Sequence, residues 1–299
     1  MAATARPWAP LLESLVRCPS CGASLRIDPA PACGTCGWTG NVIDGIPDFV
    51  EAGTLGASHH AEVEAQTAAV DAYYENELRL TCHWDRLSSD DIAERLDWPT
   101  GVALDLGCGT GTAGAGLVRH GMRVVGADLS PPCLAVAGRR LDAVVRVDAA
   151  KLPFADASFD ALVARGALHH MKDPHAVMQE VRRVLKPGAP ALFLDPREYA
   201  WLEPIKDRLR ASDDSFTHDH HAYDPAAYEA LIGSALRVDK AWSEHPLAIL
   251  AAHGLDLIPM PAFIRRRPLT RALLGIDRAL NQTPLGALGH LLVVRATRV

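Results

Sequence analysis

A glycine-rich loop that directly follows a short apolar run constrains the fold of this chain more than any other feature. Residues 102–106 predict a buried strand, and Gly107, Gly109 and Gly111 follow it. Glycine adopts the positive φ angles of a sharp turn and lets backbone N–H groups approach a ligand closely. The loop therefore predicts a ligand-binding turn between a strand and a helix.

Apolar runs alternate with amphipathic segments on the C-terminal side of this loop. Further strands are predicted at 123–127, 144–147, 159–164, 191–194, 236–242 and 291–295. A helix is predicted at 175–185, because Lys186-Pro187-Gly188 is a helix-stop signal. Strands separated by helices form right-handed crossovers, so the pattern predicts an α/β fold with a parallel sheet.

Three acidic residues separate two interpretations of the glycine loop. Residues 109–114 satisfy G-x-G-x-x-G, which is the dinucleotide-binding pattern. Asp105, however, stands two residues before the first glycine of the loop, and Asp128 and Asp148 close the second and third predicted strands. Asp128 lies where a ribose diol would bind in either interpretation.

With these residues in place, the stretch 102–195 resembles class I S-adenosylmethionine (SAM)-dependent methyltransferases, in particular the small-molecule type 11 group. The resemblance implies a Rossmann-like seven-stranded sheet of order 3-2-1-4-5-7-6 with an antiparallel seventh strand. It also implies that SAM is bound, with its ribose at the second acid and its adenine at the third. The residues that it assigns to cofactor binding are Asp105, Gly107, Gly109, Gly111, Asp128, Leu129, Asp148, Ala149, Arg165 and Gly166.

Four cysteines near the N-terminus form the pattern C-x2-C-x11-C-x2-C at Cys18, Cys21, Cys33 and Cys36. Each close pair lets two thiolates bind one ion, and two pairs complete a tetrahedral site that suits zinc. Four protein ligands close the coordination shell, so we predict a structural Zn²⁺. A redox-active dithiol is the alternative, and the lack of a surrounding βαβ pattern disfavours it.

The segment that follows these cysteines leads into a D-G-I-P sequence and resembles the zinc ribbon of Trm112-like proteins, over about residues 16–50. The same kind of ribbon precedes some methyltransferase domains, including those of bacterial 23S rRNA guanine methyltransferases. We therefore expect a zinc-ribbon domain at 1–57 and a SAM-dependent methyltransferase domain at 58–299. Within the second, we expect N-terminal helices at 58–100 and a substrate-side segment at 196–290.

Two adjacent histidines are the candidate catalytic residues. His169 and His170 follow the fourth predicted strand, at the carboxyl edge where ligands bind in open α/β sheets. Imidazole is well suited to act as a general base for a hydroxyl, phenol or amine nucleophile. The alternative is that one of these rings hydrogen-bonds the backbone or packs under the cofactor.

A second polar cluster spans residues 217–225 and has three interpretations. It binds a divalent metal ion, it lines the substrate pocket, or it is a polar loop in which Asp224 caps a helix that Pro225 begins. In the family that the chain resembles, the helix before the core domain often folds over the cofactor; the alternative is that Tyr73 and Tyr74 pack in the core. The candidate substrate contacts are Tyr73, Tyr74, Arg197, His218, His220, His221 and Tyr223.

Composition restricts the partners of the 299-residue chain. Its net charge of −6 gives no general electrostatic attraction to nucleic acid. No apolar run is long enough to span a membrane, and the N-terminus lacks the pattern of a secretory signal. Seven cysteines, an odd number, favour a reducing, cytoplasmic location over a disulfide framework.

The function that these expectations favour is transfer of a methyl group from SAM to an O, N or C nucleophile of a small molecule, such as a specialised metabolite. One alternative is an rRNA guanine methyltransferase that uses the ribbon to hold RNA. The negative charge disfavours it, because phosphate contacts need Lys and Arg. Another is a non-catalytic binding or scaffold protein with the same fold. A homodimer is left open.

Overall fold

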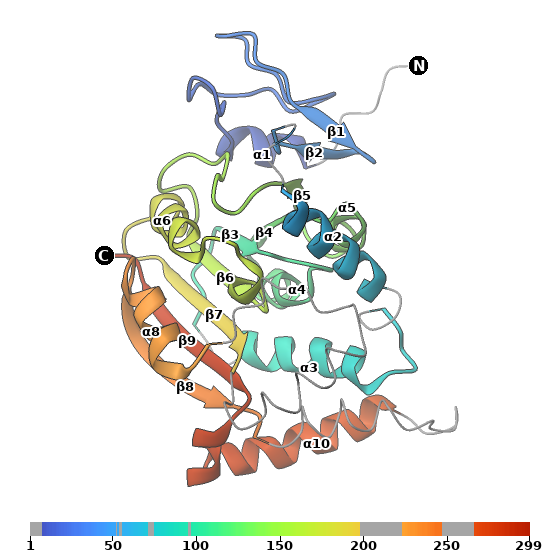
Figure 1. Cartoon of the computed structure of the whole chain (residues 1–299), viewed down its shortest axis with the longest axis vertical. Helices are drawn as coiled ribbons and strands as arrows, with labels where there is room; N and C mark the ends of the chain where they lie inside the picture. The colour runs from blue at the N-terminus through green and yellow to red at the C-terminus, as the bar shows by residue number, and fades with distance from the viewer. Residues whose placement is uncertain are drawn as a thin grey trace.

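The computed structural model describes residues 8–51, 53, 56–70, 75–94, 97–197, 223–246 and 266–299. Its described strands form one sheet in the order β1-β2-β5-β4-β3-β6-β7-β9-β8 (Figure 1). The strands of the α/β core are β3 (Val102–Leu106), β4 (Arg123–Asp128), β5 (Ala143–Arg146), β6 (Ala161–Arg165), β7 (Pro190–Pro196), β8 (Arg237–Glu244) and β9 (Leu291–Thr297). The mixed α/β class is confirmed.

Seven of these strands, from β5 to β8, follow the order 3-2-1-4-5-7-6, and β9 runs antiparallel to both of its neighbours. The expected total of seven strands is wrong, because the sheet has nine. The hairpin of β1 (Asn41–Ile43) and β2 (Ile46–Asp48) adds two strands. β2 pairs in parallel with β5 at Asp48 and Arg146, and thereby covers the edge of the core sheet.

Helices cover both faces of the sheet. α1 (Ala9–Leu15), α6 (Pro174–Val184) and α8 (Pro225–Gly233) pack on one face, and α4 (Thr112–Arg119) and α5 (Pro131–Ala137) on the other. The remaining helices are α2 (Ala57–Ala69), α3 (Leu80–Glu94) and α10 (Arg266–Asn281), with the short turns η2 (Leu168–His170) and η4 (Pro284–Leu288). α3 and α10 pack together at the end of the molecule opposite β1 and β2 (Figure 1). Among the described helices none has the length and apolar character to cross a bilayer.

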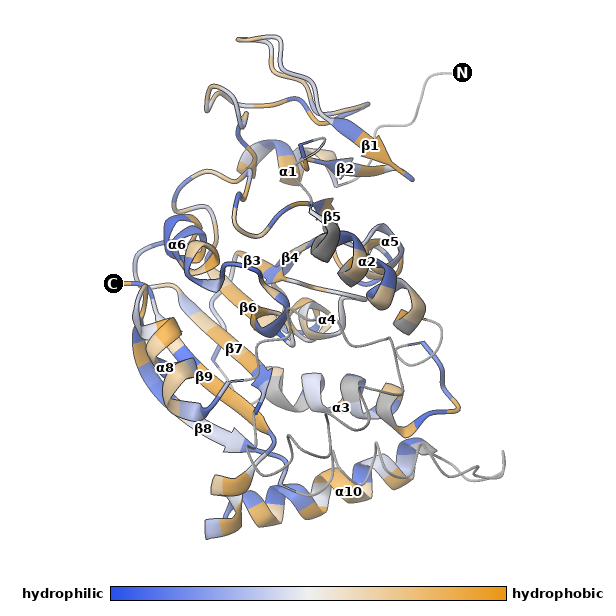
Figure 2. Ribbon diagram, viewed as in Figure 1, coloured by the Kyte–Doolittle hydropathy of each residue, from blue (hydrophilic) through white to orange (hydrophobic). Residues whose placement is uncertain are grey.

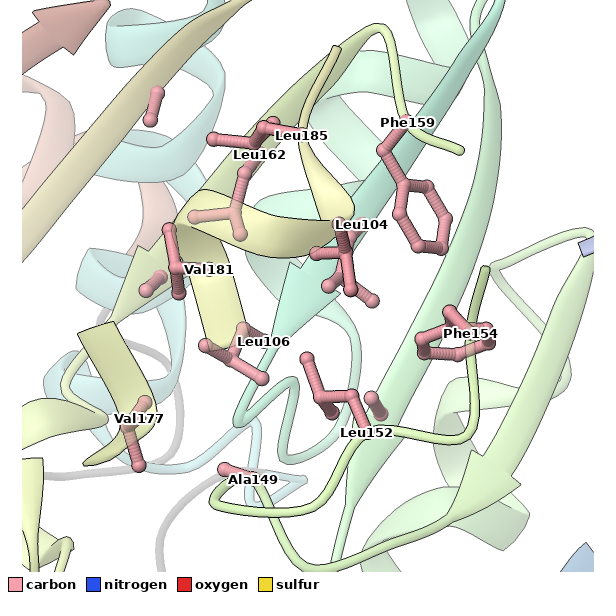
Figure 3. Close-up of a cluster of buried hydrophobic side chains, with 14 of the residues drawn as sticks. Leu104, Leu106, Ala149, Leu152, Phe154, Phe159, Leu162, Val177, Val181 and Leu185 are labelled. Atoms are coloured by element: carbon pink, nitrogen blue, oxygen red, sulfur yellow. The ribbon is translucent and has the colours of Figure 1, made fainter. Parts of the chain in front are cut away.

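The alternation of side chains along buried strands creates two apolar layers. Leu104 and Leu106 of β3 enter one hydrophobic cluster, whereas Ala103 enters the other. Strands β6, β7 and β9 are accordingly mainly hydrophobic, whereas the edge strand β8 is more polar (Figure 2). Figure 3 shows the first cluster, where the rings of Phe154 and Phe159 pack edge to face with their centroids 4.9 Å apart.

The N-terminal segment shares this first cluster with the α/β core. Leu12, Val16 and Ile27 are buried in the same cluster as Leu152 and Phe154. Backbone hydrogen bonds reinforce the contact, since the Arg17 N–H donates to the Pro153 carbonyl and the Ala155 N–H donates to the Leu15 carbonyl. The ribbon segment is therefore continuous with the hydrophobic core.

Capping residues begin two helices on one face of the sheet. Asp173 precedes Pro174 and accepts a hydrogen bond from the Ala176 N–H at the start of α6. Asp224 precedes Pro225 and accepts from Ala226 and Ala227 at the start of α8. The capping interpretation of Asp224 is thus confirmed, while the preceding histidines lie outside the described residues.

Candidate active site

A cavity of about 730 Å³ lies at the carboxyl ends of β3, β4, β5 and β6. This is the position at which open α/β sheets bind ligands, and the volume suits a small organic molecule. The predicted residues that line it are Asp105, Gly107, Gly109, Asp128, Leu129, Asp148, Ala149, Arg165, Gly166, His169 and His170.

The glycine loop forms the floor of this cavity. Gly107 and Gly109 have φ angles of +63° and +50°, which L side chains rarely adopt. A Cβ atom on Gly107 would lie 2.6 Å from that of Ala167. Gly111 is not among the lining residues; it is the N-cap of α4, and a Cβ there would lie 3.1 Å from Ala137. Close packing therefore requires glycine at 107 and 111.

Asp128 fixes the loop from the end of β4. Its two carboxylate oxygens accept hydrogen bonds from the N–H groups of Gly109 and Ser130, both at 2.8 Å. Enclosure in the cavity wall raises the pKa of Asp128, although these N–H groups favour its ionised form. Each carboxylate oxygen has a second lone pair that a ligand hydroxyl can use.

The other two acids are held by neighbouring backbone groups. Asp105, buried at the end of β3, accepts from the Gly114 N–H at 2.8 Å. Asp148 accepts from the Ala150 N–H at 2.9 Å and lies in a turn after β5. Together with Asp128 they make one wall of the cavity anionic, which favours a ligand with positively charged groups.

Arg165 ends β6 and Gly166 follows it, and both residues line the cavity. Gly166 has a φ of +60°, and its N–H donates to the Leu194 carbonyl. The Arg165 guanidinium reaches α3, where it donates to the hydroxyl of Ser88 at 2.7 Å and to that of Ser89. Arg165 therefore connects the floor of the cavity to α3.

His169 is held by a buried carboxylate. Its Nδ1 lies 2.5 Å from Oδ1 of Asp195, at the end of β7. Asp195 is fully buried, and its Oδ2 accepts a hydrogen bond from the Tyr228 hydroxyl at 2.7 Å. Burial, and then the charge of Asp195, hold the pKa of Tyr228 well above its ordinary value, so the phenol remains a donor.

His170 packs against His169 and faces α2. The two imidazole centroids are 3.8 Å apart, and the Nε2 atom of His170 lies 3.5 Å from the side-chain nitrogen of Gln66. Gln66 itself lines the cavity from α2. α2 therefore borders the ligand cavity.

The candidate substrate contacts have different positions. Tyr223 is buried behind η2, and its hydroxyl donates to the Leu168 carbonyl at 3.3 Å. Arg197 donates to the Ala287 carbonyl at 2.6 Å. Neither residue is among those that line the cavity. The remaining candidates, Tyr73, Tyr74, His218, His220 and His221, lie outside the described residues.

The four cysteines of the N-terminal pattern converge on one point. Their Sγ atoms all lie within 4.8 Å of one another, and the pairs Cys18–Cys36 and Cys21–Cys33 are separated by 3.6 Å. A tetrahedral zinc site with Zn–S bonds of about 2.3 Å requires sulfur atoms about 3.8 Å apart. N–H groups of Cys36 and Thr35 lower the pKa of Cys33 to about 6, which favours the thiolate. The donor set and its spacing fit zinc.

Several cavity residues escape prediction from the sequence. Gln66 has no local signal, because a polar residue on a helix is ordinarily solvent-exposed. His290 and Leu291 enter the cavity where β9 begins. The position of the last strand gives a usable signal, since an antiparallel strand beside β7 starts at the edge where β7 ends.

The sheet topology and the position of the cavity are those of an α/β ligand-binding protein. Comparisons with known proteins identify its family. Residues 104–193 match the family model described as a methyltransferase domain. A demethylmenaquinone methyltransferase of Clavibacter sepedonicus is 47% identical over 90 residues, covering 28% of this chain and 37% of that protein. One of Tropheryma whipplei strain Twist is 31% identical over 195 residues, covering 59% of this chain and 77% of its own length.

A solved structure shares the fold at a TM-score of 0.51 and 20% identity, covering 82% of this chain and 98% of its own. It comes from a complex between the Haloferax volcanii Trm112 methyltransferase activator and a methyltransferase. The chain spans only 37–43% of the length of the first curated relatives that it matches. The chain belongs to the class I SAM-dependent methyltransferase family.

Proposed function

We propose that this protein transfers the methyl group of SAM to an O, N or C nucleophile of a small molecule. The observation that carries the proposal is the position of a buried His–carboxylate pair on the same cavity as the glycine loop and its three acids. The loop and acids suit the cofactor, and the pair suits deprotonation of a nucleophile. The residues suited to cofactor binding and the residue suited to deprotonation of the acceptor therefore line one cavity.

The cavity residues fit SAM in shape and charge. Gly107 and Gly109 hold their backbone close to the ligand space, and a Cβ atom on Gly109 would meet no atom within 4 Å. Asp105 and Asp128 provide acceptors for the ammonium group and the ribose hydroxyls, and Asp148 for the adenine amino group. Leu129 and Ala149 provide apolar surface for the adenine ring. SAM supplies an electrophilic methyl group on a sulfonium, and the chain must align the acceptor and exclude water.

His169 is the better candidate for the general base. An imidazole that donates Nδ1–H to a carboxylate keeps Nε2 as its basic nitrogen. Asp195 orients the ring and stabilises the imidazolium that forms when the proton of the nucleophile moves to Nε2. Tyr228 anchors Asp195 in turn. The base is required for hydroxyl, phenol and ammonium acceptors.

A small-molecule acceptor is favoured over RNA. Curated relatives that share the methyltransferase domain are named for demethylmenaquinone, which is a small molecule. The net charge of −6 opposes phosphate binding. We further propose a structural Zn²⁺ on the four cysteines and a cytoplasmic location. All seven cysteines are described and none forms a disulfide, which suits a reducing compartment. The homodimer stays a prediction.

The test combines cofactor binding with methyl transfer. Purified protein is titrated with S-adenosylhomocysteine by calorimetry, then incubated with methyl-labelled SAM and fractionated cell extract. Binding together with label in the small-molecule fraction supports the proposal, and His169→Ala should remove the label while retaining binding. Label in RNA would instead support the alternative that the protein is an rRNA guanine methyltransferase. Binding without label in any fraction would favour the scaffold alternative, and no binding would refute the cofactor assignment.

A further inference from the structure

A buried ion pair connects the ribbon to the cavity wall. Nη1 of Arg146, the last residue of β5, lies 3.0 Å from Oδ2 of Asp48, the last residue of β2. The two side chains are only 15% and 4% exposed. The same guanidinium donates from Nε to the carbonyl of Leu129 at 3.0 Å. Arg146 thus touches the ribbon with one nitrogen and a cavity-lining residue with another.

Backbone contacts fix both ends of this connection. The Phe49 N–H donates to the Arg146 carbonyl at 3.0 Å, and Oδ1 of Asp48 accepts from the Val50 N–H at 3.0 Å. On the cavity side, the Val147 N–H donates to the Asp128 carbonyl at 3.1 Å. Arg146 therefore ends β5 between Asp48 of β2 and Asp128 of β4, and Asp128 carries the proposed ribose acceptor.

The ribbon side of the connection leads back to the cysteines. The Cys33 N–H donates to the Trp38 carbonyl at 2.8 Å. The Trp38 ring stacks on Phe49, with centroids 6.1 Å apart and planes 7° apart. Phe49 is the neighbour of Asp48. A short chain of contacts therefore runs from a metal-ligand candidate to the acid that holds Arg146.

We propose that the ribbon is a positioning element for the cofactor: metal binding at the four cysteines sets Asp48, which holds Arg146 and, through it, the Leu129 wall of the SAM cavity. The inference rests on the proposed function, because it takes SAM as the cavity ligand and zinc as the ribbon metal. An unpaired buried guanidinium is costly, so loss of Asp48 displaces Arg146 toward water and releases the Leu129 carbonyl. Asp48 and Arg146 are positioning residues and do not themselves line the cavity.

Coupling between two binding sites is reciprocal. If zinc improves the affinity for the cofactor by some factor, the cofactor must improve the affinity for zinc by the same factor. Typical couplings correspond to about 5-fold to 150-fold. The reciprocal effect gives a readout on the metal that does not depend on catalysis.

The main variant is Asp48→Asn, which keeps the size of the side chain and removes its charge. Asp160→Asn is the matched control. Asp160 also bonds a neighbouring backbone N–H, that of Val102 at 2.9 Å, and a cation, Lys186 at 2.7 Å, but it lies at the opposite ends of the strands. Each variant is checked for zinc content, melting temperature and the Kd of S-adenosylhomocysteine.

We expect Asp48→Asn to retain one zinc per chain and to bind S-adenosylhomocysteine about 10-fold more weakly. Asp160→Asn should lower the melting temperature and leave the Kd unchanged. Saturating S-adenosylhomocysteine should raise the zinc affinity of the wild type, measured by equilibrium competition with a colorimetric chelator, and have less effect in Asp48→Asn. Asp48→Glu should recover part of the affinity, which a general loss of stability would not explain.

An unchanged Kd in zinc-loaded Asp48→Asn would overturn the inference, as would a wild-type zinc affinity that does not change when S-adenosylhomocysteine binds. Should Asp48→Asn not fold, Arg146→Lys takes its place, since an ammonium cannot bridge Asp48 and the Leu129 carbonyl as the fork of a guanidinium does. The same weakening of affinity is expected, and an unchanged Kd refutes the inference. Failure of the wild type to bind S-adenosylhomocysteine would instead contradict the proposed function.

Discussion

The Nδ1 atom of His169 lies 2.5 Å from Oδ1 of Asp195, which is fully buried at the end of β7. A buried carboxylate at this distance fixes the orientation of an imidazole and defines which ring nitrogen is basic. The arrangement makes Asp195 the residue that positions the proposed base, His169.

Replacement of Asp195 by Asn tests the proposed base. The amide preserves shape but neither stabilises an imidazolium nor enforces the Nδ1–H tautomer. We expect kcat to fall by about 10²-fold to 10⁴-fold, the usual range for general base catalysis. Steady-state kinetics with an acceptor taken from the labelled small-molecule fraction measure the loss, and calorimetry with S-adenosylhomocysteine should show an unchanged Kd.

Three further variants make this result specific. His169→Ala, alone or combined with Asp195→Asn, should lower kcat by about as much as Asp195→Asn alone. The effects of residues that act as a unit are not additive. Tyr228→Phe should have a smaller effect, since it removes only the anchor of Asp195. Wild-type kcat in Asp195→Asn would show that the acceptor reacts without this base.

Asp128 provides a test of both stability and binding. Enclosure raises its pKa above the ordinary 3.8, so the folded state binds more protons than the unfolded state between these two pKa values. Stability therefore falls as the pH rises through this window, and the cost persists at neutral pH. Asp128→Asn removes this pH-dependent cost but offers one acceptor oxygen to the two N–H groups of Gly109 and Ser130, so its stability relative to the wild type should rise between pH 4 and pH 7.

The same variant should bind S-adenosylhomocysteine about 10-fold to 100-fold more weakly, because a charged acceptor contributes about 1.5–3 kcal/mol. Urea unfolding between pH 4 and 8 and calorimetry measure the two effects. A stability difference that does not vary with pH would contradict the assigned cost of the carboxylate.

The sequence predicts those structural features that depend on residues close to one another along the chain. The strand before the glycine loop, the positive φ angles of Gly107 and Gly109, and the Asp224 cap follow from local chemistry, and the structure contains all of them. The pairing of β2 with β5 depends on residues almost 100 positions apart, 48 and 146, so the nine-stranded sheet could not be expected. Asp195 directly follows the predicted strand 191–194, but its bond to His169 depends on side-chain packing.

Arg140 makes a testable connection between the glycine loop and the segment that follows α2. Its guanidinium donates to the Thr110 carbonyl at 2.8 Å and to both carboxylate oxygens of Glu75 at 2.8 and 2.9 Å. Both side chains are about one quarter exposed, so the pair is partly shielded from solvent. We expect Arg140→Ala to lose about 1–2 kcal/mol of stability and to increase amide exchange near Glu75.

Arg139 is exposed and provides the matched control, so Arg139→Ala should leave both properties unchanged. Hydrogen-exchange mass spectrometry locates the effect, and urea unfolding gives its size. Equal exchange in Arg140→Ala and the wild type would show that Glu75 is held by other contacts, such as its ion pair with Arg86 at 3.2 Å.

The four-cysteine cluster leads to a prediction about the zinc content of the protein. We expect one zinc per chain, and we expect Cys21→Ser combined with Cys36→Ser to lose it. Both thiols are exposed, so their substitution removes little except metal ligation. Cys82→Ala, at a buried cysteine of α3 outside the cluster, should retain the metal. Equal zinc content in the double variant and the wild type would exclude these thiols as ligands.

Loss of the metal should also destabilise the α/β core, because Leu12, Val16 and Ile27 share its hydrophobic cluster. A metal present at 100-fold to 1,000-fold its Kd stabilises a protein by about 3–4 kcal/mol. At about 2–4 °C per kcal/mol for a chain of this class, chelation should lower the melting temperature by about 6–16 °C. Calorimetry with and without chelator measures the shift. A separate low-temperature transition for the ribbon, with the main transition unchanged, would show instead that the two parts unfold independently despite the shared cluster.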